Sequence, residues 1–174
     1  MPVYTPIVGT LGYLLSPQRN AVLMVHRTAR SHDEQLGKWN GLGGKLEADE
    51  DVAAGMIREI REEAGVEVTS MRFRATISWP GFGPNGEDWL GFVFVIDACD
   101  GDTATSNEEG TLHWVQLSTL LEACEPGSRA AEDLPMWEGD RHFLPLVFDD
   151  DPRIVHGVMP YHGGKPTGWR FTRV

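Results

Sequence analysis

The sequence has few cysteines, no long apolar run and no internal repeat. Its 174 residues include only two cysteines, Cys99 and Cys124, which suits a reducing compartment but does not exclude a disulfide. No apolar stretch approaches the length of a membrane span, and no basic region precedes the apolar segment near the start. We therefore expect a cytoplasmic protein that has no membrane partner.

Positive charge is also scarce. Lys and Arg number 15 against 26 Asp and Glu, so the formal net charge is −11 at pH 7. A chain this negative is not expected to bind nucleic acid polymers, because both surfaces carry the same sign of charge. A small anionic substrate is still compatible with this charge if bound metal ions supply a positive field. No Ser–His or Cys–His arrangement typical of a nucleophilic enzyme stands out.

The length and the hydrophobic pattern predict one domain, residues 1–174, of the α+β class. Strands are expected over residues 4–15, 21–26, 68–79, 89–98 and 112–117, with a last hairpin over 154–162 and 168–174. Helices are expected over 50–64, over 118–124 with Ser118 as the cap, and over 137–148 with Pro145 distorting it. Polar connections are expected over 27–38 and 125–135. Since these elements do not alternate regularly, we expect helices flanking a mixed sheet.

The stretch from Trp39 to Val66 runs from a glycine-rich loop into a charged helix. Asp49 is the expected N-cap, and Gly65 follows the helix, where a positive φ is favourable. Apolar residues three and four apart form the expected buried face: Val52, Ala53, Met56, Ile57 and Ile60.

Three glutamates, Glu59, Glu62 and Glu63, share the other face of this helix because they are three and four residues apart. Clustered carboxylates repel one another but are good ligands for hard cations such as Mg²⁺ or Mn²⁺. Arg58 is placed to hold a carboxylate such as Glu50 or Glu62. Taken alone, the segment also fits a solvated helix face with Arg–Glu pairs.

The surrounding residues favour the metal-binding interpretation. Gly44, Glu50 and the run from Arg58 to Val66 (REIREEAGV) match the whole pattern G-x5-E-x7-R-E-U-x-E-E-x-G-U, in which U is apolar. The chain thus resembles the Nudix hydrolases, with no departure inside the motif. The resemblance implies a Nudix fold, an α/β/α sandwich with a mixed central β-sheet and the glutamate helix on one face.

The same resemblance implies roles for particular residues. Glu59 and Glu63 correspond to metal ligands, Glu62 to a metal ligand or general base, and Gly43 to a ligand through its backbone carbonyl. Arg58 belongs to the same catalytic set. A further acidic ligand from a distant loop is expected at Glu109, with Glu108 as the alternative and simple surface exposure as the structural interpretation.

Outside the motif, the chain resembles the MutT-homologue branch of this family, which hydrolyses oxidised purine nucleoside triphosphates. The similarity is carried by the stretches WNGLGGK and PMWEGDRHFLP, and it implies base contacts for Asn40, Trp137 and Asp140. Trp137 offers a face for stacking, and Trp79 is the candidate for the opposite wall, although a lone Trp often packs in a core. The chain departs from that branch at one point. The branch has two adjacent aspartates after the Trp, whereas this chain has Gly139 followed by Asp140.

These observations predict a Mg²⁺-dependent pyrophosphohydrolase, with Mn²⁺ as an alternative cofactor, which converts 8-oxo-dGTP or a related purine triphosphate to the monophosphate and pyrophosphate and so sanitises the nucleotide pool. Hydrolysis of ADP-ribose or of a dinucleoside polyphosphate is the alternative within the family. A nucleotide sensor without turnover is disfavoured, because every glutamate of the motif is present. The sequence leaves both a monomer and a homodimer open.

Overall fold

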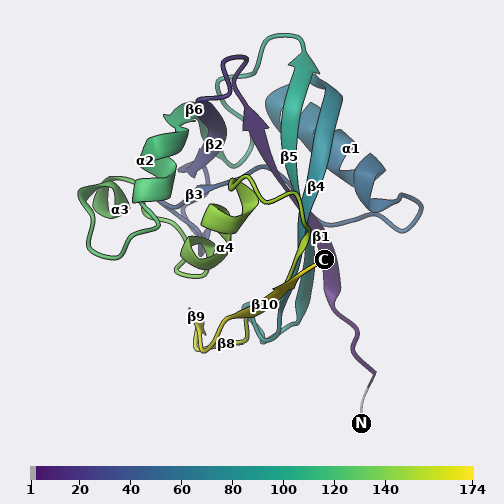
Figure 1. Ribbon diagram of the computed structural model, residues 1–174, viewed down its shortest axis with the longest axis vertical. Coiled ribbons are helices and arrows are strands. Elements are labelled where there is room, and N and C mark those ends of the chain that lie inside the picture. The colour runs from purple at the N-terminus through teal and green to yellow at the C-terminus, as the bar shows by residue number, and fades with distance from the viewer. Residues whose placement is uncertain (1–2) are drawn as a thin grey trace.

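The computed structural model describes residues 3–174 and contains one large mixed sheet with helices on both faces (Figure 1). The sheet strands are β1 (Ile7–Leu15), β2 (Ala21–Arg27), β3 (Trp39–Asn40), β4 (Glu67–Trp79), β5 (Trp89–Asp100), β6 (Gly110–Gln116), β7 (Val155–Val158) and β10 (Arg170–Arg173). The short strands β8 (Tyr161–His162) and β9 (Lys165–Pro166) form a separate hairpin. The helices are α1 (Val52–Ala64), α2 (Leu117–Glu122), α3 (Arg129–Asp133) and α4 (Asp140–Val147). Within residues 3–174, no helix has the length and apolar character needed to cross a membrane.

The strand order is β10-β7-β4-β5-β1-β2-β3, with β6 paired to β2. Strand β1 is parallel to β5 and β4 is parallel to β7, whereas the remaining pairs are antiparallel. Strand β5 lies in the middle of the sheet and is nearly continuously apolar because both of its faces are covered. Val93 and Val95 of β5 pack into one core, and Phe94 and Ile96 pack into the other.

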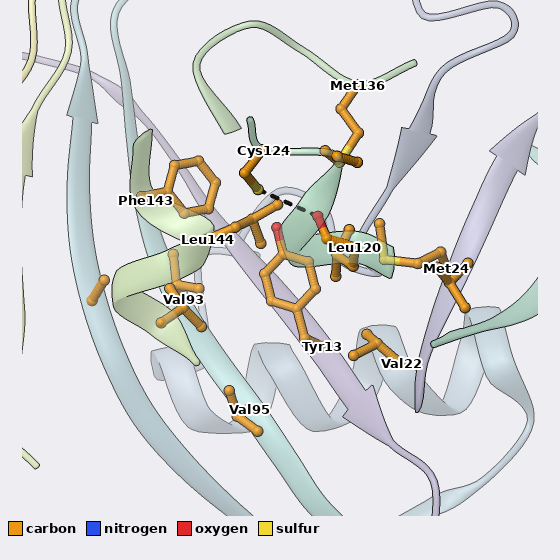
Figure 2. Packing of buried hydrophobic residues seen from close by; sticks show 14 of the residues in the cluster. Tyr13, Val22, Met24, Val93, Val95, Leu120, Cys124, Met136, Phe143 and Leu144 are labelled. Atoms are coloured by element: carbon orange, nitrogen blue, oxygen red, sulfur yellow. Dashed lines mark hydrogen bonds between the residues drawn. The ribbon is translucent and has the colours of Figure 1, made fainter. Parts of the chain in front are cut away.

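The two cores lie on opposite faces of the sheet. Helix α1 buries Met56 and Ile60 with Leu14 and Ile96 on one face. The other face packs against α2, α3 and α4, where Phe143 and Leu144 lie close to Tyr13 and Val93 (Figure 2). The predicted α/β/α sandwich with a mixed sheet is therefore confirmed. Both cysteines are free, and the buried Cys124 thiol donates to the carbonyl of Leu120 at 3.4 Å.

The site is positioned by a split between β1 and β2. These strands pair only at one end, through Leu14 and Leu15 of β1, and the glycine-rich segment after β3 fills the gap. Isolated bridges join Gly9 to Lys45 and Gly12 to Leu42. The backbone passes so close to β1 that a Cβ added at Gly43, where φ is +144°, would lie 2.1 Å from the carbonyl oxygen of Thr10. Only glycine fits there, and the split brings the loop beside the end of β1.

The ends of helix α1 correct one prediction and confirm another. The N-cap is Asp51 and not Asp49, because the Asp51 carboxylate accepts from the backbone N–H groups of Ala53 and Ala54, each at 2.9 Å. Residues before Asp51 form a turn in which Glu50 accepts from the backbone N–H of Glu47 at 2.9 Å. At the other end, Gly65 follows the helix with φ of 73°, as expected.

Three further predictions about local structure were wrong. Helix α2 begins directly after β6 at Leu117, so Ser118 lies inside it and is not its cap. The connection over 125–135 contains α3, which Ser128 caps by accepting from the N–H of Ala131 at 3.0 Å. Helix α4 begins at Asp140, because a turn from Trp137 precedes it. The last hairpin is present as β7 and β10, with the β8–β9 hairpin between them.

Candidate active site

A cavity of about 380 Å³ opens beside the glycine-rich loop. Its walls come from β1, from residues 27–45, from the ends of β4 and β5, from the turn at Phe82, and from the segment around α4. Six residues predicted from the sequence line it: Asn40, Gly43, Trp79, Glu109, Trp137 and Asp140. Glu63 and Glu59 lie behind Gly43 and Gly44 at one end of the cavity, whereas the Glu62 side chain is 58% exposed and contacts Arg58. The structure thus brings the two predicted parts of the site together.

Glu63 faces the cavity end from helix α1. Its Oε2 accepts from the backbone N–H of Gly43 at 2.9 Å. Burial raises the pKa of Glu63 to about 8, and the nearby charge of Glu109 adds to this, although the Gly43 hydrogen bond opposes it. A positive charge placed between these carboxylates would therefore be strongly stabilised.

Glu59 is also buried, with its side chain against the glycine-rich loop. A Cβ at Gly44 would lie 2.6 Å from Glu59 Oε1, so the glycine makes room for the carboxylate. Burial raises the pKa of Glu59, while a hydrogen bond of 2.8 Å from Arg58 lowers it. Glycine is thus required at position 44 to make room for the Glu59 carboxylate and not to form a turn.

Arg58 organises this end of the site. Its guanidinium donates to Glu50 at 2.6 and 3.0 Å and to Glu62 at 3.2 Å, so both expected partners are present. It also contacts Glu59 and donates to the carbonyl of Lys45 at 3.2 Å. The hydrogen bonds from Arg58 lower the pKa of Glu50 to about 2. Arg58 consequently lies among the carboxylates as a cation that orients them.

The expected metal ligands do not form one ready-made shell. Within residues 3–174, no three His, Cys, Asp or Glu side chains are grouped closely enough to hold a metal ion. The physical reason is that Arg58 occupies the carboxylates of Glu59 and Glu62, and Arg27 forms an ion pair with Glu109. Yet all the donors are hard oxygens, and Glu63 is already destabilised as an anion, so the set fits Mg²⁺ or Mn²⁺ once the flexible side chains turn inward.

Glu109 and Glu108 were the two candidates for the acidic ligand from a distant loop, and the structure distinguishes them by their exposure. Glu109 lines the cavity and its side chain is half-buried, whereas the side chain of Glu108 is 94% exposed and lies 3.5 Å from Arg30. The structure therefore brings Glu109, and not Glu108, to the motif glutamates.

Aromatic rings form the other end of the cavity. Phe82 is their centre, with its ring centroid 5.3 Å from Trp137, 5.0 Å from Tyr161 and 6.5 Å from Trp89, all in edge-on arrangements. Trp79 lines the cavity but also packs against Phe143 in the core. Trp79 thus belongs both to the core and to the cavity wall, and its contact with a base stays a prediction.

Asp140 begins helix α4 and lines the cavity between Tyr13 and Tyr161. Burial raises the pKa of this carboxyl to about 7. The preceding Gly139 has a structural explanation, because a Cβ there would lie 2.2 Å from the hydroxyl oxygen of Tyr161. Tyr161 therefore occupies the space that a second acidic side chain would need.

Several residues of the cavity were missed or undervalued. Residues 27–38 were expected only to form a polar connection, yet Gln35 lines the cavity and accepts from Asn40 Nδ2 at 2.7 Å. Phe82 was not singled out from the sequence, although an aromatic residue amid Gly and Pro could have indicated a wall. Among the described residues, Thr10 Oγ1 and Trp89 Nε1 are buried without a partner, and both residues line the cavity.

Comparison with known proteins agrees with this geometry. The family model described as NUDIX domain matches residues 5–146. The chain is 30% identical over 138 residues to the oxidized purine nucleoside triphosphate hydrolase of Mus musculus, covering 79% of this chain and 77% of the relative. It is 29% identical over 129 residues to an uncharacterized Nudix hydrolase of Bacillus subtilis, covering 72% and 73%. The crystal structure of a MutT protein from Bacillus halodurans superposes with a TM-score of 0.76 at 23% identity, covering 95% of this chain and 97% of that one.

Proposed function

Because the chain belongs to the Nudix family, whose hydrolases act on phosphoanhydrides and generally use divalent cations, we propose that it hydrolyses purine nucleoside triphosphates to the monophosphate and pyrophosphate. We propose further that a C8-oxidised purine, as in 8-oxo-dGTP, is the preferred base. The observation that carries this proposal is the single cavity, which joins the carboxylates behind Gly43 to the aromatic wall at Trp137. Its two ends match a charged triphosphate and a flat base.

At the phosphate end, the carboxylates of Glu59, Glu62, Glu63 and Glu109 and the carbonyl of Gly43 would hold Mg²⁺ or Mn²⁺. When bound, such ions neutralise the phosphates, polarise the anhydride and lower the pKa of water. Arg27 and Lys45 also line the cavity and add positive charge near the phosphates. The negative chain can therefore bind a negative substrate.

The motif carboxylates also supply a base. Glu62 is the most exposed of them, with a side chain 58% exposed and a single 3.2 Å contact to Arg58 among the polar contacts of the described residues. It is free to turn and accept a proton from water that attacks the β-phosphorus, next to the α-phosphate. The bond between that phosphorus and the bridging oxygen then breaks, which releases the nucleoside monophosphate and pyrophosphate. Arg58 keeps Glu59 and Glu50 in place during this step.

At the base end, the Trp137 ring offers an apolar face and Asp140 a hydrogen-bonding carboxyl. The pKa of about 7 lets Asp140 donate as the neutral acid or accept as the anion. Gly139 leaves the site with one carboxyl where the related branch has two, and the Tyr161 hydroxyl fills that space. This replacement is the reason for keeping ADP-ribose and dinucleoside polyphosphates as alternative substrates.

The proposal is tested by pyrophosphate release with Mg²⁺ and with EDTA, from 8-oxo-dGTP, 2-oxo-dATP, dGTP, dATP, ADP-ribose and diadenosine polyphosphates. We expect metal-dependent release that is fastest with an oxidised purine triphosphate. Equal rates with all triphosphates would reduce the function to a general pyrophosphohydrolase. Turnover of only ADP-ribose or dinucleotides would refute the base pocket, and tight binding without any turnover would indicate a sensor.

A further inference from the structure

The loop between β2 and β3 reaches the cavity through one side chain, Gln35. Its Oε1 accepts two hydrogen bonds, one from Asn40 Nδ2 at 2.7 Å and one from Trp137 Nε1 at 3.4 Å. These partners are the two residues proposed to contact and stack the base. A single oxygen atom therefore holds both of them.

Gln35 is itself held in place by the loop. Its backbone N–H donates to Asp33 Oδ1 at 2.9 Å, and Asp33 Oδ2 accepts from Arg27 Nε at 2.7 Å. The side chains of Arg27 and Asp33 are only 11% and 10% exposed. Because Arg27 also pairs with Glu109, a continuous chain of polar contacts joins the phosphate end to Gln35. The carboxamide of Gln35 is thus positioned before any ligand binds.

This contact decides which way the Asn40 carboxamide is turned. A carboxamide has an oxygen that accepts and a nitrogen that donates, and a flip exchanges their places. With Nδ2 directed at Gln35 Oε1, the Asn40 Oδ1 is left as the acceptor available to a base. The Trp137 N–H donates to Gln35 Oε1 and so fixes the Gln35 carboxamide with its oxygen toward Asn40. A flipped Asn40 amide would then place two oxygens against each other, so the pair of contacts favours one orientation.

The consequence concerns N7 of a purine. In an ordinary purine N7 is an acceptor, whereas oxidation at C8 leaves a hydrogen on N7 and makes it a donor. With the N7 edge of the base toward Asn40, the Asn40 oxygen would accept from the N7–H of the oxidised base and would face the unprotonated N7 of the ordinary base without a hydrogen bond. A polar group left unpaired in a closed site is costly, so this one atom can separate the two bases.

We propose that Gln35 is a specificity-determining residue, which selects C8-oxidised purines by holding the Asn40 carboxamide with its oxygen toward the base. This inference rests on the proposed function, because it assumes that the base lies between Asn40 and Trp137. Gln35 is a positioning residue in this role, since it acts through Asn40. Its substitution is therefore expected to change the ratio of the affinities for the two bases.

The test is the binding of 8-oxo-dGMP and dGMP without metal, followed by tryptophan fluorescence and by calorimetry. The variants are Gln35→Leu, which removes the oxygen, and Gln35→Glu, which keeps an acceptor for Asn40 and Trp137. The matched control is Glu34→Gln, a change at the exposed neighbouring residue. Thermal melting of each variant verifies that it is folded.

We expect the wild-type protein to prefer 8-oxo-dGMP, and Gln35→Leu to lower that preference by about tenfold, the discrimination expected from one polar pairing. Gln35→Glu and Glu34→Gln should keep the wild-type ratio of dissociation constants. A general weakening by Gln35→Leu with the ratio unchanged would show a structural role and overturn the proposal. A wild-type protein that binds both nucleotides equally, or neither, would overturn it too. The proposed function fails separately, if the expected binding ratio is found but no triphosphate is hydrolysed.

Discussion

The two ends of the cavity are built in opposite ways. The phosphate end is formed mostly by residues 43–63, which lie on one loop and one helix and are joined by local hydrogen bonds such as that from Gly43 to Glu63. The base end is formed by Trp79, Phe82, Trp137 and Tyr161, which come from separate parts of the chain. Under the proposed function, a contiguous segment carries the reaction, while the choice of substrate depends on how distant segments meet.

The electrostatics of the ends differ as well. The motif carboxylates share cationic partners, with Arg58 alone contacting Glu50, Glu59 and Glu62. At the base end, burial raises the pKa of Asp140, and only a hydrogen bond with the backbone of Trp137 opposes this shift. Both ends therefore hold a buried carboxyl with a raised pKa, Glu63 and Asp140, but only at the phosphate end do the neighbouring carboxylates share a cation. The following predictions test this contrast.

The largest effect is expected at the phosphate end. Glu62→Gln and Glu63→Gln should each lower kcat by about 1,000-fold, because each removes a carboxylate that acts on water or on the metal. The dissociation constant for a nucleoside monophosphate should change less than twofold. Steady-state hydrolysis and calorimetry measure the two quantities.

The matched control for these variants is Glu67→Gln, since Glu67 is exposed and pairs with Arg61 outside the cavity. Its kcat should equal that of the wild type. Full turnover by both Glu62→Gln and Glu63→Gln would rule out the assigned roles of these glutamates.

The reverse pattern is expected at the base end. Trp137→Ala should weaken binding of a purine monophosphate by roughly tenfold to a hundredfold, because stacking on the indole is lost. Hydrolysis of a triphosphate ester without a base should be unaffected. Trp114→Ala, at a Trp that is 42% exposed on β6, is the control and should leave both quantities unchanged. If the two substitutions weaken binding equally, Trp137 does not stack the base.

Asp140 links the base end to pH. Its pKa of about 7 in the folded chain exceeds the ordinary 3.8, so the folded state binds this proton more tightly than the unfolded state. Stability from this group is therefore fully present below about pH 4 and is lost as the pH rises through 7. Asp140→Asn should melt at a higher temperature than the wild type at pH 8, by about 3 °C or more, with a smaller gap toward pH 4.

Thermal melts across pH 4 to 9 measure this gap. The control is Glu138→Gln at the exposed neighbour, which should follow the wild-type profile. A gap for Asp140→Asn that is the same at every pH would mean that Asp140 does not titrate as the burial implies.

The smallest effect concerns the helix that carries the glutamates. Asp51→Ala should destabilise the protein by about 1 kcal/mol, because the N-cap hydrogen bonds to Ala53 and Ala54 are lost. The melting temperature should fall by about 3 °C, with kcat nearly unchanged. Asp49→Ala, which alters the residue that the sequence pattern favoured as the cap, should have no effect. Equal losses from the two variants would contradict the observed cap.

These regions also differ in how well they could be predicted. The motif and the helix with Gly65 at its end were predicted, because hydrophobic periodicity and residue spacing are local signals. The mixed sandwich was predicted from the resemblance to the Nudix family. The cap was misplaced by two residues, since two nearby aspartates have the same propensity and only the turn at Glu47 distinguishes them. Helix α3 was missed because its five residues carry too short a pattern.

The sequence by itself determined the class of chemistry, because all the carboxylates of the motif lie within one stretch of a loop and helix. Only the tertiary structure decided that Glu109 and not Glu108 joins them, that Tyr161 fills the space beside Gly139, and that Gln35 holds Asn40 and Trp137. Each of these contacts joins residues brought together by the sheet or by the loop. Their specificity arises from shape and hydrogen-bond direction, which no local pattern of residues encodes.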